Sequence, residues 1–322
     1  MKLNKIISQP VGDKSLVIPT GIASLDRMMM GGLRVGHVFT VGARPAMGKT
    51  AFVMSLVRNI GIINRVPTAV LSMQYAEHDI ARKLWAAEFG WKNTKRMSQQ
   101  IIVESKMNQD EKDALSMLQN IGFESPIRSK EEFERYKRMM LEAPVWIEHD
   151  FMLTMDEAIC KMERLKKENN VSMIVLDGLD WIVTNPHTYA EQKHSMQKLV
   201  QTAERLQIAV VLTQELNRNV ENRVGNWPTL SDLRDGYSTE TLTSMVMLIY
   251  RPEYYGIQED EKGSTDGKAD IIIAKNAFGD TGSVRLNFFE RARFEDEPAC
   301  VPSIEMPPRM NDDNDDCLFP FA

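Results

Sequence analysis

The stretch "VFTVGARPAMGKTAF" (residues 38–52) decides the fold, because it joins an apolar run to a loop that ends in Gly48, Lys49 and Thr50. A chain that passes from a buried strand through a glycine-containing loop into a helix leaves backbone N–H groups pointing at one spot. The helix N-terminus adds positive potential there, so such a loop binds phosphate. The helical pattern of "TAFVMSLVRNI" (50–60), directly after the loop, argues against a chance match.

The loop pattern assigns chemistry to individual positions. Lys49 would reach the β- and γ-phosphates of a nucleotide, and the Thr50 hydroxyl would hold Mg²⁺. The first glycine of the usual pattern is replaced by Ala43. We therefore predict a nucleotide site formed by the whole loop, namely by Ala43, Arg44, Pro45, Ala46, Met47, Gly48, Lys49, Thr50 and Ala51.

The composition is that of an ordinary globular protein, with 322 residues, 43% of them hydrophobic and 26% charged. No apolar run approaches the roughly 20 residues that span a bilayer, and the first residues lack a secretory signal, so we expect no membrane association. Three scattered cysteines fit free thiols in a reducing cytoplasm. The net charge of −6 excludes a protein that coats DNA with its whole surface, but not one that touches DNA with a few loops.

Several short apolar runs alternate with helical patterns such as residues 190–207. These runs are "HVFTVGA" (37–43), "TAVLSMQ" (68–74), "SMIVLDG" (172–178), "IAVVLTQ" (208–214), "SMVMLIYR" (244–251) and "ADIIIAK" (269–275). Continuous hydrophobicity is typical of strands covered on both faces, so we predict an α/β fold with a mostly parallel sheet and helices on both faces. Ligands bind at the carboxyl ends of such strands. The residues expected there are Lys49, Thr50, Gln74, Asp177, Gln214 and Lys275.

Two of these positions have alternative interpretations. Asp177 ends the run "MIVLD", where an aspartate either holds the metal's water shell or caps a strand; the phosphate loop favours the metal role. Gln214 could sense the γ-phosphate or simply bond a neighbouring backbone group, and the sequence favours neither.

The order of these motifs resembles the motor domain of DnaB-type replicative helicases, which share the RecA-like P-loop ATPase fold. The resemblance covers about residues 15–295 in unbroken order. It is carried by "PTGIASLDRMMMGGLRVGH" (19–37), "GARPAMGKTAF" (42–52), "VLSMQ" (70–74), "IVLDGLDWI" (174–182), "TQELNRNVENR" (213–223), "PTLSDLRD" (228–235), "IIIAKNAFGDTG" (271–282) and "VRLNFFE" (284–290).

The resemblance implies a ring, usually of six subunits, with ATP between neighbours and single-stranded DNA gripped by loops that face the channel. By position, Lys49, Thr50 and Asp177 would bind ATP and Mg²⁺, and Gln214 would sense the state of the nucleotide. The segment 217–235 would supply the DNA loop, which makes Arg218, Arg223 and Arg234 candidates for phosphate contacts.

Two departures from the family pattern concern hydrolysis. The family has a glutamate at the position of Gln74, where it orients the attacking water; glutamine can position water but cannot take its proton. The family also sends an arginine into the neighbour's site from the position held here by Ala277, and such a finger is worth roughly 10³–10⁵ in rate. Lys275 would then be the remaining cation of that loop.

The predicted organisation is an arm (1–17), an ATPase domain (18–295) with a helical insertion (about 92–143), and an acidic disordered tail (296–322). The insertion carries two capping-box patterns, Asn108 to Glu111 and Ser129 to Glu132. The family's N-terminal helical domain is not expected within this sequence. The tail, "NDDNDDCLFPFA", resembles the acidic tips of bacterial single-strand-binding proteins, which dock on replication enzymes; a solubilising tail is the alternative.

Three functions are compatible with these motifs. The first is an ATP-driven helicase or translocase on single-stranded DNA, with weakened hydrolysis. The second is a hydrolysis-deficient ATP-binding scaffold, loader or regulator of replication proteins. A strand-exchange or clock-type ATPase on the same fold ranks last, because "SDLRD" (231–235) favours the helicase branch.

Overall fold

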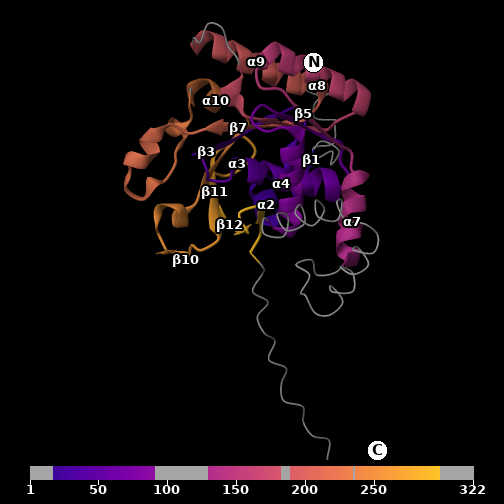
Figure 1. Ribbon diagram of the computed structural model, residues 1–322. Coiled ribbons are helices and arrows are strands. Elements are labelled where there is room, and N and C mark those ends of the chain that lie inside the picture. The colour runs from indigo at the N-terminus through magenta and orange to yellow at the C-terminus, as the bar shows by residue number, and fades with distance from the viewer. Residues whose placement is uncertain (1–16, 91–129, 183–188, 235, 298–322) are drawn as a thin grey trace, which may run out of the picture.

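All six apolar runs form strands of one sheet. The computed structural model describes residues 17–90, 130–182, 189–234 and 236–297. The six strands are β3 (Val38–Ala43), β4 (Thr68–Ser72), β6 (Met173–Asp177), β7 (Ala209–Glu215), β8 (Met245–Tyr250) and β11 (Lys268–Asn276) (Figure 1). Every residue of β3, β4, β6 and β8 is buried, as continuous apolar runs predict.

The sheet has nine strands in the order β13-β12-β11-β8-β3-β7-β6-β4-β5. The six strands from β8 to β5 (Val145–His149) run parallel to one another. β11, β12 (Gly282–Phe289) and β13 (Arg293–Glu295) pair in antiparallel fashion at the other side. The prediction of a mostly parallel sheet is thus confirmed. The edge strand β5 was not predicted, because its half-buried residues form no continuous apolar run.

The direction of β11 overturns one expected placement. Asn276, near the carboxyl end of β11, pairs with Met245 at the amino end of β8. Since β8 runs parallel to β3, the end of β11 lies at the opposite edge of the sheet from the phosphate loop. The expectation that Lys275 lies beside Lys49 was therefore wrong. An apolar run predicts a buried strand but does not reveal which way the strand runs.

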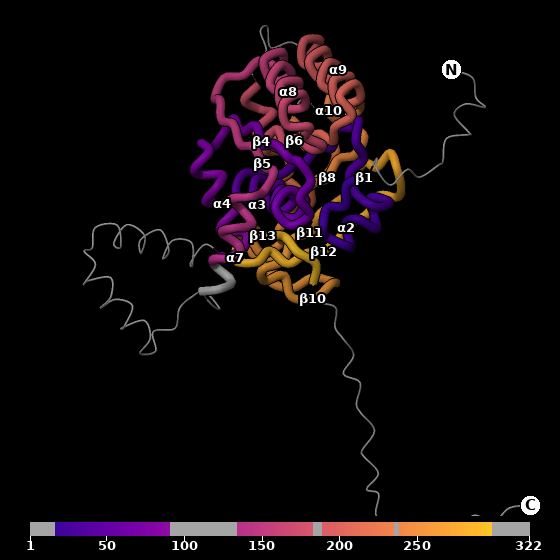
Figure 2. The backbone as a smooth tube through the Cα atoms, turned by 90° about the vertical axis from the view of Figure 1, so that its right-hand side faces the viewer, coloured from indigo at the N-terminus to yellow at the C-terminus, as the bar shows by residue number. Residues whose placement is uncertain are grey.

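Helices cover both faces of the sheet (Figures 1 and 2). On one face lie α8 (Met155–Asn169), α9 (Tyr189–Leu206) and α10 (Gly236–Leu242); toward the other lie α2 (Ala23–Met28), α3 (Lys49–Val57), α4 (Glu77–Phe89) and α7 (Lys130–Leu141). The predicted helix at 190–207 is confirmed as α9, which buries Met196, Leu199 and Ala203 against the strands. A separate core packs beneath α3 and α4.

The remaining elements are short. They comprise the pairs β1 (Val17–Ile18) with β2 (Leu33–Arg34) and β9 (Glu259–Asp260) with β10 (Gly263–Ser264), a π-helical turn at Arg58–Ile63, and 3-10 turns at Leu179–Trp181, Arg218–Asn222, Val224–Asn226, Leu230–Asp232 and Pro252–Tyr255. The predicted helical character of the insertion is confirmed for α7. Asn108, Glu111, Ser129 and the tail from residue 298 lie outside the described residues, as does the side chain of Glu132. No helix in the described ranges is long and apolar enough to cross a membrane.

Candidate nucleotide-binding site

The loop between β3 and α3 has the backbone shape of a phosphate cradle. Gly48, directly before α3, has a φ of 101°. A Cβ on this residue would lie 3.0 Å from the ring of Phe288 and 3.1 Å from that of Phe294, so the loop is packed against β12 and β13. Ala46 has a φ of 64°, which is uncommon for a residue with a side chain. Its carbonyl accepts a hydrogen bond from Nη1 of Arg251 at 3.1 Å.

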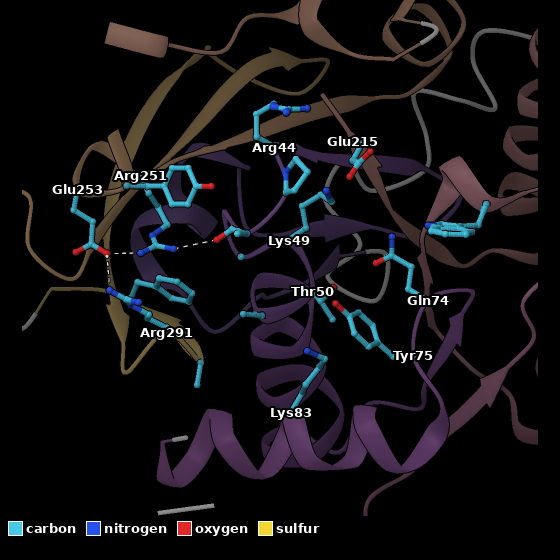
Figure 3. Close-up of a pocket in the computed structure, with 18 of the residues that line it drawn as sticks. Arg44, Lys49, Thr50, Gln74, Tyr75, Lys83, Glu215, Arg251, Glu253 and Arg291 are labelled. Carbon is cyan, nitrogen blue, oxygen red and sulfur yellow. Dashed lines mark hydrogen bonds and ion pairs between the residues drawn. The ribbon is translucent and has the colours of Figure 1, made fainter. Parts of the chain in front are cut away.

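A cavity of about 800 Å³ opens over this loop (Figure 3). This volume lies within the range of small-molecule sites, roughly 300–1,000 Å³. Most of the predicted loop residues line the cavity, namely Arg44, Pro45, Ala46, Gly48, Lys49, Thr50 and Ala51. Gln74, two residues beyond the end of β4, lines it as well. Ala43 and Met47 are instead buried beneath the loop.

Thr50 lines the cavity and contacts Asp177, which is buried behind it. The Thr50 hydroxyl lies 3.3 and 3.5 Å from the two carboxylate oxygens of Asp177. Asp177 is fully buried at the end of β6, where Oδ1 also accepts a hydrogen bond from the Thr213 hydroxyl at 2.9 Å. Burial raises the pKa of Asp177, because the charged carboxylate is removed from water. A hydroxyl and a carboxylate converging on one point are the oxygen donors that Mg²⁺ requires, so these residues fit the predicted metal role.

The ammonium of Lys49 is held inside the loop. Its Nζ donates a hydrogen bond to the carbonyl of Ala43 at 3.0 Å. Burial lowers the pKa of Lys49, whereas the nearby carboxylates of Glu215, Asp180 and Asp177 oppose this shift. Asp180 is itself fixed by the backbone N–H of Glu215 at 2.6 Å. The loop therefore places a partly desolvated cation at the cavity wall, where an anionic ligand would interact with it strongly.

The two glutamines differ in their surroundings. Gln74 lines the cavity beside Thr50. Gln214 is buried and donates a hydrogen bond through Nε2 to the carbonyl of Arg234, while its Oε1 has no partner among the described residues. The structure thus gives Gln214 the backbone bond of the simpler interpretation, and the role as a γ-phosphate sensor stays a prediction.

Lys275 caps the end of α10. Its ammonium donates to the backbone carbonyls of Glu240 at 2.6 Å, Thr241 at 3.1 Å and Thr243 at 2.7 Å. Partial burial lowers the pKa of Lys275. Ala277 is exposed two residues further on, at the same edge. Both positions face away from the cavity of their own chain, so a catalytic role for Lys275 would have to be exerted in another copy.

The three predicted DNA-binding arginines are not equivalent. Arg223 forms a two-pronged ion pair with the buried Asp232, at 2.6 and 2.8 Å. Burial alone would raise the pKa of Asp232, but the hydrogen bonds from Arg223 and Thr229 hold this pKa below its usual value. Arg234 lies 3.3 Å from the carboxylate of Glu215. Arg218 is exposed at the start of a 3-10 turn. Arg223 therefore fastens the loop together, while Arg218 projects from it.

Several cavity residues were missed in the sequence. Arg251 and Glu253 follow β8 directly, at the same edge as the phosphate loop, so the rule about strand ends could have identified them. Tyr75 follows Gln74, and Lys83 comes from the middle of α4. No motif marks Lys83, because it reaches the cavity only through the packing of α4 against α3.

A mostly parallel sheet with a phosphate loop after one strand, and a buried aspartate at the end of another, is the arrangement of the RecA-like P-loop fold. The chain belongs to the DnaB-like helicase C terminal domain family, whose model matches residues 17–296. The resemblance noted in the sequence is thereby confirmed.

Curated relatives agree with this assignment. The chain is 27% identical over 274 residues to the replicative DNA helicase DnaB of Leifsonia xyli subsp. xyli, covering 84% of this chain and 54% of that protein. It is 26% identical over 277 residues to the corresponding helicase of Geobacillus stearothermophilus, with 85% and 55% covered. The chain thus spans about half the length of these relatives. A solved DnaB-like replicative helicase, studied with primase, matches the fold with a TM-score of 0.72 at 21% identity, over 92% of this chain and 67% of that one.

Proposed function

We propose that this chain is the ATP-dependent motor of a DnaB-type DNA helicase or translocase, acting in replication as a ring, of six copies by analogy, on single-stranded DNA. The observation that carries the proposal is that Lys49 and Thr50 line one cavity, with the buried Asp177 in contact with Thr50, in a chain of this family. Thr50 and Asp177 would hold Mg²⁺, which when bound neutralises charge on the β- and γ-phosphates of ATP.

Hydrolysis is proposed to be slow. Gln74 occupies the cavity position where the family's glutamate would orient water, and a neutral amide can position a water molecule without accepting its proton. Ala277 has no group that could neutralise charge on the transferring phosphoryl in a neighbouring copy. Since positioning and electrostatic stabilisation dominate phosphoryl transfer, the loss of both groups would slow turnover far more than binding.

A phosphate-release assay with and without single-stranded DNA tests the motor function, with Lys49→Ala as the control. The motor predicts release that DNA stimulates and that Lys49→Ala abolishes. ATP binding without any DNA-stimulated release would remove the motor function and leave the second candidate.

That second candidate is a hydrolysis-deficient ATP-bound scaffold, loader or regulator of replication proteins, which Gln74 and Ala277 favour. The double variant Gln74→Glu with Ala277→Arg tests whether these two positions limit hydrolysis. It should raise turnover steeply if they were assigned correctly, and unchanged turnover would contradict the assignment.

Mass measurement in solution with ATP tests the ring, which requires a closed oligomer rather than a monomer. The same measurement with purified replication proteins, with and without residues 296–322, tests the tail as a docking segment.

A further inference from the structure

Tyr75 and Lys83 form a small cluster beside Thr50, one of the residues proposed to hold Mg²⁺. Tyr75 lies close to Thr50 at the wall of the cavity. The ammonium of Lys83 lies 4.1 Å from the centre of the Tyr75 ring, a distance typical of a cation–π contact. All three side chains line the cavity, and Lys83 rises from α4 toward Thr50 and Tyr75 (Figure 3).

The charges around Lys83 orient it toward the phosphate end of the cavity. Burial lowers the pKa of Lys83, while Asp177 is the largest of the negative charges that oppose this shift, ahead of Asp79. Asp79 is half-buried and is already paired with Arg82 at 2.5 Å. Gln74 contributes no negative charge. Lys49 and Lys83 therefore flank Asp177 as two ammonium groups in a partly desolvated space.

We propose that Lys83 is a second phosphate-binding cation that contacts the terminal phosphate of bound ATP. The cation–π contact with the Tyr75 ring would hold its ammonium in position. This inference rests on the proposed nucleotide site. The γ-phosphate is the group within reach because Tyr75 and Lys83 lie beside Thr50, the residue expected to hold the Mg²⁺ that accompanies the β- and γ-phosphates. Arg251 and Glu253 lie at the other end of the cavity (Figure 3).

The contact would make the site discriminate ATP from ADP. A hydrogen bond between an ammonium and a phosphate oxygen is stronger than a neutral one, and a partly buried site is screened less by salt. ADP lacks the phosphate that Lys83 would touch. The residue would thus hold ATP in a chain whose hydrolysis is slow, which suits both a slow motor and an ATP-bound scaffold.

The test compares Lys83→Met, Lys83→Gln and Lys83→Arg with wild type, and uses Lys167→Met as a matched control, because Lys167 is an exposed lysine on α8. Affinities for a non-hydrolysable ATP analogue and for ADP are measured by calorimetry with Mg²⁺, on proteins whose thermal unfolding has been recorded. Losing a charge-assisted hydrogen bond should weaken the analogue by about tenfold or more. ADP affinity should change by less than about threefold, as should both affinities in Lys83→Arg and Lys167→Met.

The outcomes separate this inference from the function on which it rests. Wild-type protein that binds the analogue no better than Lys49→Ala would remove the nucleotide site and the inference together. If wild type binds and the Met and Gln variants bind equally well, only the role of Lys83 is refuted. An equal loss of analogue and ADP affinity would also refute it, since it would show that Lys83 supports the shape of the cavity rather than the γ-phosphate.

Discussion

Replacing Gly48 with alanine should damage the phosphate cradle in two separable ways. The first is conformational: at a φ of 101°, an L-residue pays roughly 1–2 kcal/mol relative to glycine. The second is steric: the new Cβ would lie 3.0 Å from Phe288 and 3.1 Å from Phe294, closer than ordinary contact distance. The two rings stack with centroids 4.3 Å apart, and Phe294 is fully buried, so neither can move aside freely. Overpacking of this kind costs about 1–3 kcal/mol.

A matched glycine isolates the steric part. Gly263 has a φ of 98°, and a Cβ added to it would meet nothing within 4 Å. Gly263→Ala should therefore lower the free energy of unfolding by about 1–2 kcal/mol, and Gly48→Ala by about 2–5 kcal/mol.

Equilibrium denaturation in urea measures both values, and calorimetric titration with an ATP analogue shows whether the cradle still binds. Binding should be lost in Gly48→Ala and kept in Gly263→Ala. Equal destabilisation of the two variants would show that the rings of Phe288 and Phe294 yield without strain. Retained nucleotide affinity in Gly48→Ala would refute the cradle geometry itself.

Four further predictions concern single side chains. Asp177→Asn should abolish Mg²⁺-dependent nucleotide binding without lowering stability. Because burial raises the pKa of Asp177, the folded state keeps a proton that the unfolded state releases. The free energy of unfolding of the wild type therefore falls as pH rises from the unfolded-state pKa through the folded-state pKa. Urea denaturation at several pH values should show the free energy of unfolding of Asp177→Asn rising relative to that of wild type as pH increases over this window. A difference that does not change with pH would contradict the prediction. Arg223→Met should lower the free energy of unfolding, because the buried carboxylate of Asp232 loses its ion-pair partner, and an unchanged value in urea denaturation would contradict this role. Arg218→Met should leave stability unchanged but reduce the salt dependence of single-stranded DNA binding by about 0.7 in the log–log slope, and an unchanged slope would remove Arg218 from the DNA contacts. Lys275→Met should lower unfolding free energy by about 1–2 kcal/mol, since three carbonyls at the end of α10 lose their donor, and a neutral effect would show that water replaces it.

The sequence predicted those features that depend on local chemistry. The runs that became β3 and β6 are apolar throughout because both faces of these strands are covered, and this pattern is visible without any structure. Asp177 was identified because it interrupts such a run at its end. The phosphate loop was identified from the spacing of Gly48, Lys49 and Thr50, which follows from the shape that a phosphate group requires.

What the sequence could not predict depends on strand direction and on packing between distant segments. The misplacement of Lys275 is a failure of the first kind, since an antiparallel and a parallel buried strand have the same apolar pattern. Lys83 is an example of the second kind, because it reaches the cavity only through the crossing of α4 over α3. Arg251 was predictable in principle: it ends the same run that forms β8, and β8 points toward the phosphate loop.

The antiparallel direction of β11 also affects how ATP binding and ATP hydrolysis are related in the proposed motor. Lys49, Thr50 and Gln74 line the cavity at one edge of the sheet of one chain, and the buried Asp177 contacts Thr50 at the same edge. The loop that begins after Asn276 leaves from the opposite edge, where the end of β11 pairs with the start of β8. A residue in that loop cannot serve the cavity of its own chain and could assist only a second copy. Binding therefore depends on residues that a single chain keeps, whereas fast hydrolysis would require both a base at position 74 and a cation at position 277. Because this chain carries an amide at the first and a methyl group at the second, an isolated copy should already bind ATP as tightly as an assembled one, while assembly alone should do little to speed its turnover.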